Sequence, residues 1–169
     1  GSADLASVLA RFGYGTPTGI GFPGEAGGVV PDLLNWTDIT RATVSYGQGI
    51  SMTPLQMAAV YATVANAGMW VQPRLVRGTS GLDGQLVEPP RGEARRVLSE
   101  ETARMLTRML ASVVSTGTGG AAEIPGYQVA GKTGTARKLV DGRYVRRYMA
   151  SFVGFFPASD PRVVIAVSI

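Results

Sequence analysis

The residues best suited to chemistry lie in residues 129–136, around one of the chain's two lysines, Lys132. Lysine is a compact positive charge that can hold a carboxylate or pass a proton. If the stretch is a strand, its glycines leave room for another molecule, and its threonines place two hydroxyls on one face: Gly131, Gly134, Thr133 and Thr135. Taken alone, the Lys-Thr-Gly pattern fits a binding site and an ordinary strand with one exposed lysine equally well.

Residues 126–133 also satisfy the phosphate-loop pattern G-x-x-x-x-G-K-[ST]. That loop must follow a buried strand and open a helix, whose N-terminus receives the phosphates. Here the intervening residues read as a strand themselves. Residues 133–144 contain Gly134 and an Asp141-Gly142 turn, which is typical of a hairpin. The sequence therefore argues against nucleotide binding.

The composition excludes several kinds of site. The length suits one domain or part of one, and a hydrophobic content of 45% is enough for a core. Without histidine or cysteine, the chain cannot form a Ser-His-Asp triad, a Cys-His pair, a disulfide or a thiolate metal site. Acid–base chemistry must use lysine, tyrosine, carboxylates or groups from elsewhere. Neither a metal nor an organic cofactor is suggested.

The net charge of +4 comes mostly from arginine. Five basic residues gather around the expected hairpin: Arg137, Lys138, Arg143, Arg146 and Arg147. A solvated hairpin is the favoured interpretation, and an anionic ligand or partner is the alternative. No apolar run reaches transmembrane length. The chain starts within an expected helix and stops within an expected strand, which is typical of a piece cut from a larger domain.

The elements expected to position the lysine stretch include both helices and strands. Helical spacing or capping signals predict helices over residues 3–11, 35–44, 53–66 and from Ser99 onward. The strongest signal is Thr53-Pro54-Leu55-Gln56, because it combines a threonine cap, an early proline and a capping box. Residues 13–32 form a long loop rich in glycine and proline.

Strands are expected over residues 70–76, after a turn at 81–85, along the lysine stretch, and over residues 148–156 and 162–169. The last three strands, joined by short connections, predict an antiparallel meander covered by the helices. The predicted class is α+β, an antiparallel sheet flanked by helices. Tyr46, Gly47 and Gln48 form a further candidate, because two polar, planar side chains can project from a closely approached backbone. The alternative is a flexible connection to the next helix.

Several segments match one family in the same order along the chain. The chain resembles the class B penicillin-binding proteins, especially the division-type peptidoglycan D,D-transpeptidases, over nearly its whole length. Lys-Thr-Gly is itself a motif of penicillin-binding proteins and serine β-lactamases, beside S-x-x-K and a middle S-x-N motif. The matching segments are Phe12-Gly13-Tyr14-Gly15, Thr18-Gly19-Ile20, Pro23-Gly24-Glu25, Ala42-Thr43-Val44-Ser45-Tyr46-Gly47-Gln48-Gly49, Met52-Thr53-Pro54-Leu55-Gln56-Met57, Pro125-Gly126-Tyr127, Ala130-Gly131-Lys132-Thr133-Gly134-Thr135-Ala136-Arg137, Ala150-Ser151-Phe152 and Pro157-Ala158-Ser159-Asp160-Pro161-Arg162.

The resemblance implies a five-stranded antiparallel sheet with helices on both faces. It implies that a serine attacks the D-Ala-D-Ala bond of a peptidoglycan stem peptide, and that an amine from a neighbouring stem resolves the acyl-enzyme into a cross-link. β-Lactam antibiotics imitate the dipeptide. It also implies a bacterial cell-envelope location, with a parent anchored in the cytoplasmic membrane and this domain on the extracytoplasmic side. Division-machinery membrane proteins are implied as partners, and nucleic acid is not.

Residue roles follow from the same resemblance. Lys132 is similar to the lysine that supports the substrate carboxylate and the proton shuttle, and Thr133 and Thr135 to the hydroxyls that bind that carboxylate. The Thr135 N–H resembles the second oxyanion-hole donor. Gly134 lets the substrate backbone lie antiparallel to the strand. Tyr46, Gly47 and Gln48 resemble positions on the wall of the site opposite the strand. Arg137 resembles a basic position near the ligand.

The departure from the family is the absence of both S-x-x-K and S-x-N from the sequence. Residues 1–169 therefore resemble the C-terminal portion of a single transpeptidase domain, with the upstream half of that domain as a partner. We expect no catalysis from this chain alone, and self-association through an uncovered apolar face. Two alternatives stay open: a non-catalytic binding or scaffold fragment, and a relative of the serine β-lactamases or β-lactam sensors.

Overall fold

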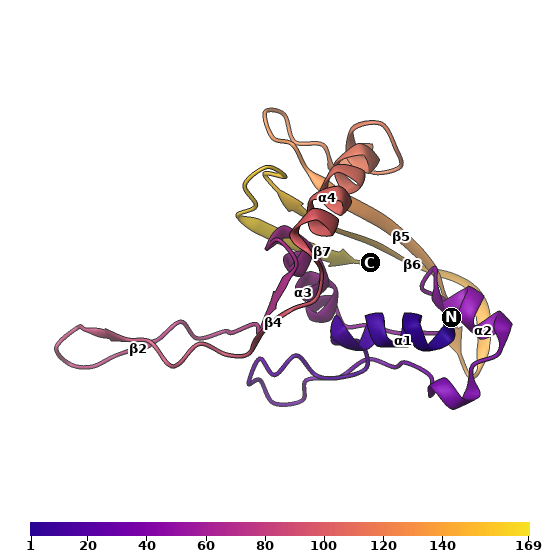
Figure 1. Ribbon diagram of the computed structural model, residues 1–169, viewed down its shortest axis with the longest axis horizontal. Coiled ribbons are helices and arrows are strands. Elements are labelled where there is room, and N and C mark those ends of the chain that lie inside the picture. Colours follow the sequence, from indigo (N-terminus) through magenta and orange to yellow (C-terminus); the bar gives the residue numbers. More distant parts are fainter.

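The computed structural model describes residues 1–169, with every side chain except that of Leu139. It is an α+β structure in which three helices are followed by four short strands, a fourth helix and three antiparallel strands (Figure 1). The helices are α1 Ser2–Arg11, α2 Asp38–Val44, α3 Pro54–Ala65 and α4 Glu100–Ser115, with 3₁₀ turns at Leu33–Asn35 and Gly120–Ala122. The strands are β1 Met69–Val71, β2 Thr79–Ser80, β3 Leu86–Val87, β4 Ala94–Arg96, β5 Ala130–Val140, β6 Arg143–Phe156 and β7 Val163–Ser168.

The main sheet is the predicted meander, with antiparallel strands in the order β5-β6-β7. Asp141 and Gly142 have φ values of 48° and 75°, as a two-residue turn between twisted strands requires. The sequence placed the start of the second strand at Tyr148, but β6 begins at Arg143. Because β7 pairs only with residues 151–156 of β6, residues 136–149 continue beyond the third strand as a two-stranded ribbon.

Helices cover one face of this sheet. α3 packs on β6 and β7, and α4 packs on β5. The core between these layers contains Val64, Ala111, Ala130, Phe155 and Ala158. Since successive strand residues point to opposite faces, Ala130 and its partner Phe155 mark the covered face.

The other face carries a row of exposed apolar side chains on β7. Val163, Ile165 and Val167 are 43%, 43% and 48% exposed. The five strands with helices on both faces, implied by the resemblance, are thus only partly present: this sheet has three strands and one covered face in the described chain. Self-association through the open face stays a prediction.

The helix signals read from the sequence are confirmed. Thr53 and Gln56 form the reciprocal capping box that opens α3, and Ser99 accepts a hydrogen bond from the Thr102 N–H at the start of α4. Along α4, Ala103, Ala111 and Val114 are buried. Leu106, Leu110 and Val113 are half-buried.

The strand predicted over residues 70–76 is wrong in extent, because β1 ends at Val71. Pro73 lacks an N–H for a ladder, and the side chain of Gln72 bonds instead to the Gly19 carbonyl and the Glu93 N–H. β1 pairs with β4, a strand that the sequence did not predict. Between them, β2 and β3 form a narrow arm that projects from the rest of the molecule (Figure 1).

Candidate active site

Lys132 is the third residue of β5, which lies at an edge of the main sheet. Its side chain is exposed. The ammonium Nζ donates to the Thr133 carbonyl oxygen at 2.9 Å and to Thr133 Oγ1 at 3.2 Å. The lysine charge and the threonine hydroxyl are thus side by side on an edge strand, a combination that can bind a carboxylate through one ion pair and one hydroxyl donor.

Thr118 is a neighbour of this pair that the sequence analysis missed. Its hydroxyl lies 3.2 Å from Thr133 Oγ1, across 15 residues of sequence. It comes from the segment after α4, which showed only the small residues of a joint and no signal for a site. The contact ties the Thr133 hydroxyl to the loop that follows α4.

Thr133 and Thr135 lie on one face of β5, as strand periodicity predicts, since their partners on β6 are Phe152 and Ala150. Gly131 precedes the two threonines and Gly134 lies between them, and β6 approaches both glycines closely. A Cβ on Gly131 would collide with the Phe152 ring, and a Cβ on Gly134 would lie 2.6 Å from Ser151 Oγ. Side chains of β6 therefore occupy the room that these glycines leave on the faces of the sheet.

Tyr46, Gly47 and Gln48 lie in the turn that follows α2. The Tyr46 hydroxyl donates to Gln48 Oε1 at 3.3 Å, and the Tyr46 ring is 69% exposed. Gly47 has φ = 90°, so glycine is needed at this turn. No hydrogen bond or ion pair in the described part of the chain joins this turn to Lys132.

Arg137 lies farther along β5, where its partner is Tyr148. The side chain is exposed. It is four residues beyond Thr133 and has the same strand parity, so it projects from the face that carries the two threonines. Arg137 therefore lies on the same face of β5 as Thr133 and Thr135.

The segments of the loop of residues 13–32 that resemble the family form hydrogen bonds that hold this loop together. The Glu25 carboxylate accepts hydrogen bonds from Thr18 Oγ1 at 2.6 Å, from the Thr18 N–H at 2.7 Å and from the Gly19 N–H at 3.1 Å. These bonds, led by that of the Thr18 hydroxyl, lower the pKa of the Glu25 carboxyl. Glu25 thus closes the loop on itself.

Gln56 fixes the same loop from α3. Its side chain is buried, and its amide group donates to the carbonyl oxygens of Gly13, Thr16 and Gly27 at 3.3, 2.8 and 2.7 Å. Its Oε1 accepts the Thr53 N–H at 2.9 Å. One side chain therefore caps the helix and contacts three loop carbonyls with its two N–H donors, the Gly13 carbonyl being the most distant.

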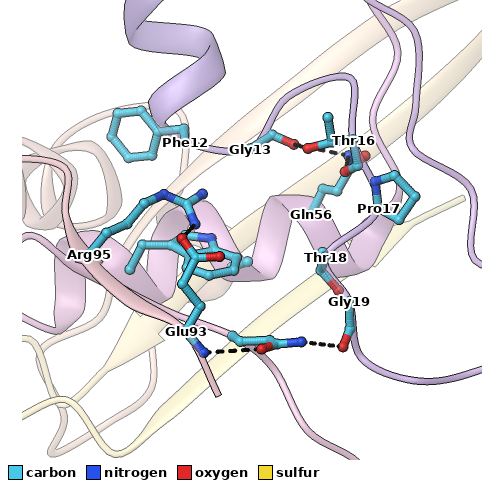
Figure 2. A pocket seen from close by; sticks show the side chains of 12 residues that line it. Phe12, Gly13, Thr16, Pro17, Thr18, Gly19, Gln56, Glu93 and Arg95 are labelled. Carbon is cyan, nitrogen blue, oxygen red and sulfur yellow. Dashed lines mark hydrogen bonds and ion pairs between the residues drawn. The ribbon is translucent and has the colours of Figure 1, made fainter.

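A cavity of about 230 Å³ opens beside this loop, between residues 12–19, α3, β1 and β4. In Figure 2, Gln56 points to the Gly13 and Thr16 side, and Arg95 and Glu93 lie across the cavity from Pro17 and Thr18. The Arg95 guanidinium stacks 3.7 Å from the Trp70 ring centroid and pairs with Glu93 at 2.8 Å. No residue of β5 lines this cavity, and its charged groups are paired with each other, so it is separate from the lysine site.

Among the described residues, no group of three or more carboxylates is placed to hold a metal ion. Burial raises the pKa of Tyr61 to about 12. None of the helices in the described chain combines the length and apolar character needed to cross a membrane.

Comparison with known proteins agrees with this fold. The sequence matches the family described as penicillin binding protein transpeptidase domain over residues 1–169. It is 44% identical over 170 residues to penicillin-binding protein PbpB of Mycolicibacterium smegmatis, covering 95% of this chain and 26% of that protein. It is 42% identical to peptidoglycan D,D-transpeptidase FtsI of Escherichia coli K12, covering 99% of this chain and 27% of that protein.

Solved structures give the same result. Penicillin binding protein 3 of Mycobacterium tuberculosis, complexed with ampicillin, superposes with a TM-score of 0.94 at 41% identity, covering all of this chain and 40% of that one. The transpeptidase domain of Burkholderia pseudomallei penicillin-binding protein 3 gives 0.86 at 39% identity, covering 99% and 49%. The chain belongs to the penicillin-binding protein transpeptidase domain family. It spans about a quarter of the length of the curated relatives that it matches.

Proposed function

We propose that this chain is the C-terminal portion of the transpeptidase domain of a peptidoglycan D,D-transpeptidase. In this proposal it supplies the strand that binds the substrate's terminal carboxylate. The observation that carries it is the Lys132 ammonium beside the Thr133 hydroxyl on an edge strand, in a chain of this family. An edge strand offers backbone groups to an extended peptide, and the ammonium offers a partner for its C-terminal charge.

The reaction needs groups from the part of the domain that precedes this chain. The serine of S-x-x-K attacks the carbonyl carbon between the two D-alanines and gives its proton to the lysine of that motif. The C–N bond breaks, the released D-alanine amine takes up the proton, and an ester to the serine remains. An amine of a second stem peptide then attacks the ester, which forms the cross-link and returns the proton to the serine.

This chain contributes binding and charge stabilisation to these steps. Lys132 and the hydroxyls of Thr133 and Thr135 hold the carboxylate, which sets the scissile bond in place. The Thr135 N–H donates to the oxygen that becomes negative in the tetrahedral intermediate. Tyr46, Gly47 and Gln48 form the opposite wall once the preceding half of the domain is docked. β-Lactams are bound by the same groups and acylate the serine.

The setting of the parent protein follows from the same proposal. Relatives carry the names FtsI and stage V sporulation protein D. We therefore place the parent in the bacterial cell envelope, anchored in the cytoplasmic membrane with this domain outside it. Its role is in division, with membrane proteins of the division machinery as partners.

Intact-mass spectrometry after incubation with benzylpenicillin tests this function. We expect one covalent adduct on the parent protein and none on the isolated chain of residues 1–169. A stoichiometric adduct on the isolated chain would mean that one of its own serines is the nucleophile. A parent that forms no adduct would favour a binding or scaffold role, and rapid turnover of the adduct would favour a β-lactamase.

A further inference from the structure

An open groove of about 320 Å³ lies between α4 and the segment that leads into β5, and its volume is close to the lower limit for ligand-binding pockets in proteins. Apart from Gln128, its lining residues belong to one side of α4, where positions four residues apart are neighbours. The groove is lined by Thr107, Arg108, Ala111, Ser112, Ser115 and Gln128.

The polar side chains of this groove are largely available to a ligand. Arg108, Ser115 and Gln128 are exposed, and their side chains form no hydrogen bond or ion pair within the part of the chain that the structure describes. The other two hydroxyls of the groove contact groups of α4 and its C-terminal cap. The cavity in Figure 2 differs, because its amides and charged groups bond to the loop or to one another.

Both walls of the groove are fixed by packing that needs no ligand. α4 packs on β5 and buries Ala111, which lines the groove. On the other wall, the backbone carbonyl oxygen of Gln128 accepts the Ala158 N–H at 2.8 Å, and the next residue, Val129, is buried. A ligand would therefore meet a preformed groove, which lowers the entropic cost of binding.

The available groups define the chemistry of that ligand. A guanidinium offers only N–H donors, an amide offers two N–H donors and a carbonyl acceptor, and a hydroxyl both donates and accepts. None of the described residues that line the groove has a carboxylate or an aromatic ring. A ligand with many oxygen acceptors, several hydroxyl donors and little apolar surface matches this set. These are the properties of a saccharide with acetamido or carboxyl groups, whereas an extended peptide is usually held by a strand edge and apolar pockets.

We propose that this groove binds one unit of an amino-sugar glycan. Arg108 donates to a carboxyl or acetamido oxygen of the sugar, and Gln128 and Ser115 bond to its hydroxyls. The choice of glycan rests on the proposed function, because the stem peptides of peptidoglycan are attached to a chain of N-acetylated amino sugars. No residue of 129–136 lines the groove, so it would hold the glycan independently of the strand that binds the stem peptide.

Glycan binding to the acylated parent protein tests this groove. The parent is saturated with benzylpenicillin, which blocks the proposed transpeptidase site, and is then titrated with a peptide-free tetrasaccharide of alternating N-acetylglucosamine and N-acetylmuramic acid. We expect calorimetry to give a dissociation constant on the order of 1 mM, as a few exposed hydrogen bonds allow. Arg108→Gln should weaken binding about fivefold and Gln128→Ala about threefold.

The matched control removes the same charge from the preceding turn of α4. Arg104 is exposed and does not line the groove, so Arg104→Gln should keep the affinity within about twofold. An equal loss in the Arg104 and Arg108 variants would overturn the site, because it would show a general effect of net charge. Full affinity in both groove variants would overturn it as well.

Two further outcomes separate this proposal from its alternatives. Complete displacement of the tetrasaccharide by inorganic phosphate would show a simple anion site and would overturn the assignment of a saccharide. A parent that is acylated but does not bind the tetrasaccharide would refute the groove and leave the proposed function intact. A parent that takes up no benzylpenicillin would refute the proposed function, and with it the choice of this glycan.

Discussion

The segments that carry the family resemblance form two regions, which differ in whether their polar side chains are hydrogen-bonded within the chain or exposed. Around Gln56 and Glu25, each polar side chain is engaged by the chain's own loop, and no buried side-chain polar atom lacks a partner among the described residues. Around Lys132, the ammonium is exposed and hydrogen bonds only to the next residue. The first region holds the loop of residues 13–32 in place, and the second leaves its charge available to a ligand.

This contrast shows that family motifs do not all mark the reaction site. A buried amide such as that of Gln56 forms its hydrogen bonds within the protein, because a buried polar group without a partner lowers the stability of the fold. An exposed ammonium contributes little to folding stability, because water solvates it in either state. Mutations in the two regions should therefore separate stability from activity.

The largest expected effect is that of a substitution in the exposed region around Lys132. Replacing Lys132 by alanine in the parent protein should slow acylation by benzylpenicillin about a hundredfold or more, because the carboxylate loses its ion-pair partner. The free energy of unfolding should change by no more than about 0.5 kcal/mol. Time-resolved intact-mass spectrometry and urea unfolding measure the two quantities. Lys138→Ala is the control, and acylation of the Lys132 variant within threefold of normal would contradict the assignment.

Gln56→Ala should lower the free energy of unfolding more than it slows acylation. It removes the donors to Gly13, Thr16 and Gly27 and leaves buried groups unpaired, which should lower the free energy of unfolding by about 2–4 kcal/mol. Urea unfolding of the parent checks this value. The exposed Gln85, changed to alanine, should have an effect within about 0.5 kcal/mol. Equal effects of the two substitutions would show that Gln56 does not hold the loop.

A smaller effect concerns the pH dependence of the loop. Because the folded structure lowers the pKa of Glu25, its carboxylate stabilises the fold above the ordinary glutamate pKa of about 4.3. That contribution is lost as the pH falls through the folded-state pKa. Glu25→Gln should therefore lose less stability than the unaltered protein when urea midpoints are compared at pH 6 and pH 3. The exposed Glu123, changed to glutamine, should behave like the unaltered protein.

Local signals were sufficient for much of the fold. The capping box at Thr53 and Gln56, the cap at Ser99 and the Asp141-Gly142 turn all act between residues close in sequence, and all three are confirmed. The pairing of β1 with β4 was not predicted, because it joins segments separated by the β2–β3 arm. The start of β6 was missed because its first residues are polar and lie in the exposed ribbon.

The sequence by itself limited the types of residue that can act here, since the absence of histidine and cysteine leaves lysine, tyrosine, carboxylates or groups from elsewhere for acid–base chemistry. It also determined the family, through segments in a fixed order. Only the tertiary structure decided that Thr118 meets Thr133 and that β6 side chains fill the space over Gly131 and Gly134. These relations depend on register and packing between distant segments, which no local spacing records.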